Sequence, residues 1–287
     1  MTTRLTSALL LALSLVAAQG LAQDAPTPTP PRPADASRVP TPAEDARLVD
    51  TVARTLAGDF QLPVSDVAIE ALDGDALAQI LVNWGMRAEL VPDVEEAAGV
   101  AMGDRVLVRA DALAHMGAAE RARLYAHEMT HIAQARLGAS SGLTWILEGH
   151  ADWVAYRLSD RLGHRSYADS LERVRRRVRS SRLHVGRFPG LGELESTEQW
   201  LHAANTAGWA ATYGQAFLAV DRLIELYSEA KIRELFRRSG DADRRLRAVD
   251  ERSGFADLFA RRDWNAVFPA AYRDFVADFR AYLDTLR

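Results

Sequence analysis

The chain contains no cysteine. This absence excludes disulfide bonds, cysteine nucleophiles and cysteine metal ligands. A metal ion could therefore be bound only by histidine, aspartate and glutamate side chains. The chain has 287 residues, enough to form a hydrophobic core that needs no disulfides.

Lysine is almost absent, because Lys231 is the only one and arginine supplies the remaining positive charge. The formal net charge is −4. A general nucleic-acid binder normally carries a basic excess, so we expect no nucleic-acid partner. The basic run of Arg175 to Arg177 and Arg179 is typical of a solvated helix face; binding of an anionic lipid or polymer is the alternative.

Long apolar runs are scarce, and the N-terminal run from Ala8 to Ala18 is too short to span a bilayer. Its length and the preceding Arg4 are typical of a signal peptide. Small residues at Gly20 and Ala22 predict cleavage after Ala22. We therefore expect a signal peptide over residues 1–22, a periplasmic or secreted protein and no membrane insertion after cleavage. An uncleaved N-terminal anchor is the alternative.

Residues 23–40 are rich in proline, threonine and alanine and predict an extended linker. The folded domain should span 41–287 and be α+β but mainly helical. We expect a sheet-containing part over about 41–118, two central helices over about 119–163 and a helical part over about 164–287. The expected early elements are a helix over Thr41–Leu56, a strand over Val67–Leu72, a helix over Asp75–Trp84 and a short hairpin or edge strand over Gly99–Val108.

Two helices carry most of the polar residues that suggest chemistry. The first should span Ala119–Leu137, with Gly138 as the glycine that ends it. The second should begin at Thr144, a favourable N-cap, and continue to Leu162. The short Gly/Ser segment between them predicts that the two helices pack as neighbours.

The first of these helices contains the motif His-Glu-x-x-His at His127, Glu128 and His131. Residues four apart lie on one face of a helix, so both imidazoles can bind one zinc ion. Zinc lowers the pKa of a bound water toward about 7, and Glu128 could take the proton as general base. The alternative is a helix with two partly exposed histidines.

The second helix supplies the third candidate ligand, Glu148, with Asp152 one turn later on the same face. An acid among tryptophan, isoleucine and leucine is costly to bury unless it is paired or bound to metal. Two histidines and one glutamate leave a fourth position for water, which is typical of catalytic zinc. Asp152 could accept the free N–H of a ligand histidine. Gly149 should let the two helices approach closely.

In these segments the chain resembles the gluzincin peptidases, in particular the exported bacterial proteins of the peptidase MA-like type. The matching segments are Tyr125–Gln134, Trp145–Trp153 and Tyr213–Ala216. The metzincin pattern would need glycine at Gln134 and histidine at Leu137. The segment Gly99–Asp104 lacks the glutamate that anchors the substrate amine in membrane alanyl aminopeptidases, so the resemblance does not extend to aminopeptidase activity, and endo- and exo-cleavage both stay open.

The resemblance implies a thermolysin-like zincin fold with a small twisted sheet, a two-helix metal site and a helical C-terminal part. It places Val106–Val108 on the edge strand along the cleft, where an extended peptide could pair. It also implies a hydrogen-bond donor to the oxyanion, which we assign to Tyr213 at the start of a helix over Gly214–Leu226, with Gly214 leaving room for substrate.

The expected function is a zinc-dependent hydrolase that acts on a peptide or protein substrate. One alternative is a catalytically silent zincin-like module that binds peptides or cell-envelope partners. A hydrolase of non-peptide amides is a third possibility. Of the remaining histidines, His150 should have a surface or supporting role, His115, His164 and His184 should lie on the surface, and His202 is a lesser candidate for catalysis.

Overall fold

The computed structural model describes residues 42–83, 98–139, 143–184, 188–246 and 256–286. The predicted signal peptide and linker, residues 1–40, lie outside this range. The elements, in chain order, are α1 (Pro42–Gly58), β1 (Ala68–Leu72), α2 (Gly74–Asn83), β2 (Gly99–Met102), β3 (Arg105–Arg109), α4 (Ala110–Ala114), α5 (Ala118–Leu137), α6 (Thr144–Arg161), α7 (Tyr167–His184), the 3-10 turn η4 (Leu191–Glu193), α8 (Thr197–Ala207), α9 (Trp209–Tyr227), α10 (Glu229–Leu246), α11 (Ala256–Val267) and α12 (Tyr272–Thr285).

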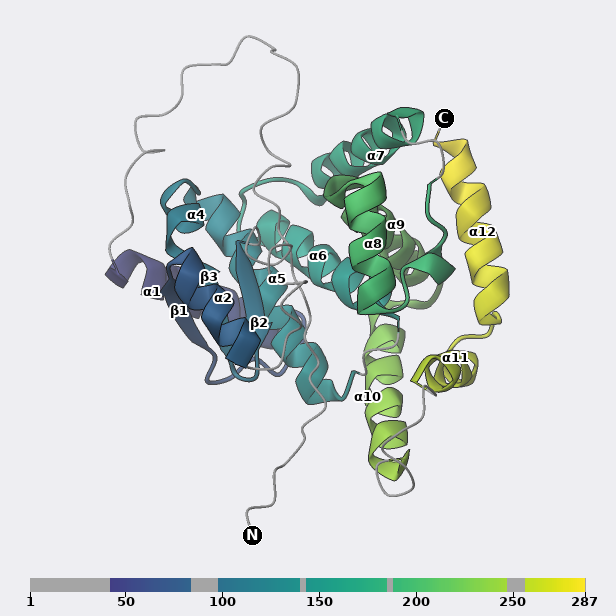
Figure 1. Cartoon of the computed structure of the whole chain (residues 1–287), viewed down its shortest axis with the longest axis horizontal. Coiled ribbons are helices and arrows are strands. Elements are labelled where there is room, and N and C mark those ends of the chain that lie inside the picture. Colours follow the sequence, from purple (N-terminus) through teal and green to yellow (C-terminus); the bar gives the residue numbers. More distant parts are fainter. Residues whose placement is uncertain (1–41, 84–97, 140–142, 185–187, 247–255, 287) are drawn as a thin grey trace.

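The architecture is mainly helical with one small sheet, which confirms the predicted α+β class. Figure 1 shows the sheet on one side of α5 and α6 and the helices α7 to α9 on the other. Helix α6 packs against both α5 and α9, and for this reason its residues are buried on nearly every face. The two helices predicted to carry the metal site are therefore the centre of the fold.

The sheet has three strands in the order β1-β3-β2. Strand β3 pairs in parallel with β1 and antiparallel with β2, with Ile69 opposite Val106 and Val100 opposite Leu107. Gly103 has a φ of 60° in the turn between β2 and β3, a conformation that glycine adopts without strain. The expectation that Val106–Val108 forms the edge strand is wrong, because β3 is the central strand. Among the described residues, β2 is the edge on the side of α5.

Helix α5 begins and ends much as its sequence predicts. The carboxylate of Glu120 accepts a hydrogen bond of 2.9 Å from the backbone N–H of Gly117, which satisfies a free donor at the helix start. Gly138 ends the helix with a φ of 98°, and the N–H of Ala139 reaches back to the carbonyl of Gln134. This is the αL ending that the glycine predicted.

The start of α6 differs from the prediction. Its N-cap is Leu143, with a φ of 76°, and Thr144 is the first helical residue. The backbone N–H and the Oγ1 of Thr144 both donate to the carbonyl of Glu195, at 2.7 and 2.9 Å. The N–H of Trp145 donates to the carbonyl of Leu194. A distant segment therefore satisfies the first N–H groups of α6 in place of a local side-chain cap.

The C-terminal helices pack on the start of α6. Trp145 stacks on Phe275 of α12, with 6.0 Å between ring centroids, and donates its indole N–H to Tyr272 at 3.2 Å. Trp264 of α11 and Phe268, which directly follows this helix, join the same buried group. The C-terminal aromatic residues are thus part of the core. Two arginines of the basic run on α7 contact other side chains. Arg175 donates a hydrogen bond to the Tyr282 hydroxyl, and Arg179 forms an ion pair with Glu172.

Candidate metal centre

Three predicted ligands converge on one point between α5 and α6. The Nε2 atoms of His127 and His131 lie 3.1 Å apart. The Oε2 of Glu148 lies 3.4 Å from the first and 3.5 Å from the second. Zinc bonds of about 2.0–2.1 Å in a tetrahedron set neighbouring ligand atoms about 3.3 Å apart. The three atoms therefore have the spacing that a single small cation requires.

The surroundings of these atoms are consistent with a bound cation. His127, Glu148 and His131 are 0%, 1% and 3% exposed. Neither carboxylate oxygen of Glu148 has a hydrogen bond within the described structure, and its only recorded ion pairs are with the two imidazoles. A buried carboxylate is costly without a compensating charge. The buried group His127, His131 and Glu148 could thus hold a metal ion.

The charges around His127 also favour a cation. Burial by itself lowers the pKa of His127, but contacts with Asp152 and Glu148 and the charge of Glu128 outweigh it and raise this pKa to about 10. For Glu148, burial favours the neutral acid, yet the two histidines lower the pKa of this carboxyl below its usual value. The three acids Asp152, Glu148 and Glu128 thus surround the two imidazoles. A divalent cation could neutralise their negative charge in place of protons on the histidines.

Asp152 lies where the sequence places it. Its Oδ1 accepts a hydrogen bond of 3.1 Å from the Nδ1 of His127, and Arg123 approaches the same oxygen at 3.8 Å. A proton on Nδ1 leaves the lone pair of Nε2 free to face the metal. Asp152 therefore fixes the tautomer and the ring orientation of His127.

His131 has a corresponding partner that sequence reasoning missed. Its Nδ1 donates to the Oε1 of Gln134 at 2.8 Å. Gln134 is 1% exposed and stands three residues after His131, on the same helical face. The i, i+3 spacing could have predicted this contact. A glutamine inside a helix is usually solvent-exposed, so its identity alone does not indicate a buried partner for a histidine.

His150 is not a surface residue. It is 0% exposed, and its Nδ1 accepts a hydrogen bond of 3.1 Å from the amide of Gln134. Its expected supporting role is therefore indirect, through Gln134. The other predicted surface histidines with described side chains, His115 and His164, are exposed. His202 is exposed on α8, whereas the ligand atoms are buried, and the side chain of His184 lies outside the described set.

Glu128 is fully buried next to His127 on α5. Strand β2 lies beside it, because a Cβ built on Gly99 would stand 3.3 Å from the Cγ of Glu128. Glu128 is not part of the group of converging ligand atoms, although its charge acts on His127. This position suits a base that acts near a metal without binding it.

Tyr213 lies close to the ligands but not at a helix start. Helix α9 begins at Trp209, so Tyr213 is in its second turn. The Tyr213 ring centroid is 6.2 Å from that of His127 and 4.9 Å from that of Trp200. The expected role of Gly214 is wrong, since a Cβ there would meet the Val178 side chain at 2.7 Å. Its small size serves packing between α9 and α7.

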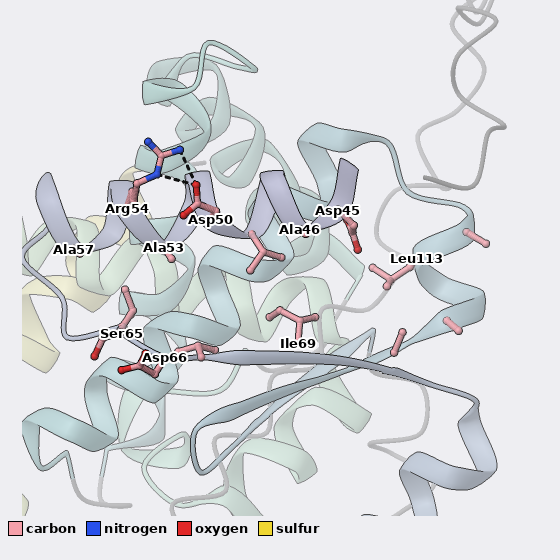
Figure 2. A pocket seen from close by; sticks show the side chains of 16 residues that line it. Asp45, Ala46, Asp50, Ala53, Arg54, Ala57, Ser65, Asp66, Ile69 and Leu113 are labelled. Atoms are coloured by element: carbon pink, nitrogen blue, oxygen red, sulfur yellow. Dashed lines mark hydrogen bonds and ion pairs between the residues drawn. The ribbon is translucent and has the colours of Figure 1, made fainter. Parts of the chain in front are cut away.

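A separate groove of about 810 Å³ lies between α1, β1 and α4 (Figure 2). Its lining is largely apolar and includes Val49, Ala53 and Ile69, while Asp50 and Arg54 pair on its rim. None of the four residues of the His-Glu-x-x-His and Glu148 set lines it. The candidate metal-binding residues and this groove are therefore in different places, and the buried cluster is the stronger candidate for function.

Within the described residues, no helix has the length and apolar character needed to cross a membrane. Comparison of the chain with protein-family models, with curated proteins and with solved structures gave no match.

Proposed function

We propose that this protein is an exported zinc-dependent hydrolase of the gluzincin type that cleaves peptide bonds. The single observation that carries the proposal is the triangle of ligand atoms from His127, His131 and Glu148, with its sides of 3.1, 3.4 and 3.5 Å. Export rests on the sequence of residues 1–22.

Zinc is the proposed ion because of the donor set. Two imidazoles and one carboxylate are typical of zinc, whereas magnesium and calcium prefer oxygen ligands alone. A site with three protein ligands keeps a fourth position for water or substrate, which is characteristic of catalytic zinc. The chain has no cysteine that could complete a closed structural site.

The side chains around the proposed ligands could each have a separate role in amide hydrolysis. A bound zinc ion would lower the pKa of a water molecule and polarise the substrate carbonyl. Glu128 would accept the proton of that water and pass it to the leaving amine. Tyr213 would donate a hydrogen bond to the oxygen on which negative charge develops.

The proposal extends to a thermolysin-like arrangement. It is supported by the order of a small sheet, a His-Glu-x-x-His helix and a neighbouring helix with the third ligand. In this arrangement the substrate would lie along β2, the described edge strand next to α5, and not along β3 as the resemblance first implied. An extended peptide can add to such an edge through backbone hydrogen bonds.

The test compares the wild type with Glu128→Gln. The variant should keep zinc, because Glu128 is not a ligand, and should lose most turnover of a broad peptide library. Glu120→Gln is the matched control, since it makes the same chemical change on α5 and glutamine can still cap the helix start. Equal hydrolysis by all three proteins would reject Glu128 as the base.

A second candidate function is a catalytically silent module that binds zinc and recognises peptides or cell-envelope partners. The observation that favours it is burial, since His127 and Glu128 are both 0% exposed. A hydrolase would have to open this site to admit substrate. Zinc-loaded wild type that binds library peptides but leaves every one intact would favour this second function.

A further inference from the structure

A chain of four hydrogen-bonded side chains leads from the metal centre to α10. His131 bonds Gln134 at 2.8 Å, Gln134 bonds His150 at 3.1 Å, and His150 bonds Glu229 at 3.2 Å. The first three are almost fully buried, and the side chain of Glu229 is 16% exposed. This series of hydrogen bonds joins α5, α6 and α10, and Asp152 is not part of it.

The hydrogen bonds allow only one orientation of the Gln134 amide. Its nitrogen donates to the backbone carbonyl of Leu147 at 2.9 Å, and a carbonyl can only accept. The same nitrogen faces the Nδ1 of His150, so both amide hydrogens are used. The Oε1 of Gln134 must therefore face His131, and it can only accept a proton from the Nδ1 of that ring. The Nε2 of His131 is then left with a lone pair toward the metal.

The hydrogen bond between His150 and Glu229, at the outer end of this series of side chains, fixes the tautomer of His150. Its Nε2 faces the carboxylate Oε1 of Glu229, so the ring proton belongs on Nε2 and Nδ1 is an acceptor. The opposite tautomer would set an N–H of His150 against the NH₂ of Gln134. Glu229 is itself held by Arg233, whose Nε lies 2.9 Å from Oε2 and whose guanidinium also bonds the carbonyl of Phe60.

We propose that Gln134, His150 and Glu229 form a positioning relay that holds His131 in the tautomer able to bind metal. Asp152 does this directly for His127, whereas His131 depends on an uncharged amide that must itself be oriented. The relay involves no change of protonation. The inference rests on the proposed metal site and is independent of whether the protein hydrolyses peptides.

The main test measures the zinc dissociation constant by chelator competition for wild type, Gln134→Leu and Gln134→Glu. Both variants lose the NH₂ group that bonds Leu147 and His150, but only glutamate keeps an acceptor for His131. The relay predicts binding about 10–100-fold weaker for Gln134→Leu. It predicts a clearly smaller loss for Gln134→Glu, which keeps the acceptor for His131 but sets an oxygen against the carbonyl of Leu147. A packing role for Gln134 predicts equal weakening in both variants.

The second test applies to the outer end of the relay and avoids the buried glutamine. Glu229→Ala should weaken zinc binding by a few-fold and shift His150 away from the Nε2–H tautomer, read from the imidazole nitrogen resonances of the zinc-loaded protein. Glu234→Ala is the matched control on α10, because Glu234 pairs only with Lys231 and Arg238 among its recorded ion pairs. It should change neither quantity.

The outcomes separate the relay from the metal site. A wild type that binds no zinc would overturn both. A wild type that binds zinc, but with the Nδ1–H tautomer at His150 or with unchanged affinity in Gln134→Leu, would overturn the relay alone. The nitrogen resonances of the wild type decide the question even if a Gln134 variant does not fold.

Discussion

The contact between α6 and α9 gives a sharp prediction for Gly149→Ala. A Cβ at this position would stand 2.3 Å from the carbonyl oxygen of Ala216, 2.6 Å from its carbonyl carbon and 2.8 Å from a methyl group of Val220. Ordinary contacts of a Cβ lie at 3.4–4 Å. The nearest obstacles are backbone atoms, which cannot move aside as a side chain can, so α9 would have to shift by about 1 Å.

Such a shift should cost stability and metal affinity together. Overpacking a well-packed core costs about 1–3 kcal/mol, and the backbone clash places Gly149→Ala at or above the upper end of this range. Zinc affinity should also fall, because the candidate ligand Glu148 directly precedes this residue on α6. The predicted loss of at least about 3 kcal/mol can be measured by denaturant unfolding of the metal-free protein.

Gly58→Ala is the control, since a Cβ at the end of α1 meets nothing within 4 Å. Its free energy of unfolding should stay within about 1 kcal/mol of the wild type, because alanine favours a helix and no clash opposes it. A loss below about 1 kcal/mol for Gly149→Ala would show that α6 and α9 are not packed this closely.

Three further predictions concern the site. Asp152→Asn should weaken zinc binding about 10–100-fold in chelator competition, because the carboxylate that orients His127 is lost; an unchanged dissociation constant would make Asp152 a packing residue. Tyr213→Phe should keep zinc and lose about 10²–10³ in kcat, and a kcat within about threefold of wild type would remove Tyr213 from the mechanism. The metal-free protein should lose stability as pH rises from 6.5 toward 10. In the folded protein the pKa of His127 is about 10, above its ordinary value of 6.5. The stabilisation from the protonated imidazole is therefore complete below pH 6.5 and disappears as the pH passes 10. Denaturant unfolding at several pH values checks this, and a free energy that does not fall between those limits would contradict it.

The parts of the site that the sequence predicts are those set by local spacing. His127 and His131 share a helical face because they are four residues apart, and Asp152 follows Glu148 by the same interval. The glycine at the end of α5 is equally local. These features depend on helix geometry alone, so they can be predicted from the sequence without knowledge of the fold.

The parts that the sequence does not predict depend on partners far along the chain. Strand β3 is central because β1, more than thirty residues earlier, pairs with its outer side. Thr144 is the first helical residue and not an N-cap, and its Oγ1 donates to the distant carbonyl of Glu195. His150 is buried because Glu229 of α10 receives its N–H. Gly149 is small because α9, and not α5, packs on it.

The central claim is that His127, His131 and Glu148 bind one zinc ion, and metal content tests it most directly. The experiment incubates purified wild type, His131→Ala and Glu148→Ala with zinc, removes the unbound metal and measures zinc per chain by elemental analysis. The wild type should retain about one zinc, and each variant should retain far less because it has lost one of three ligands. A wild type without zinc, or variants with the same zinc content as the wild type, would contradict the account.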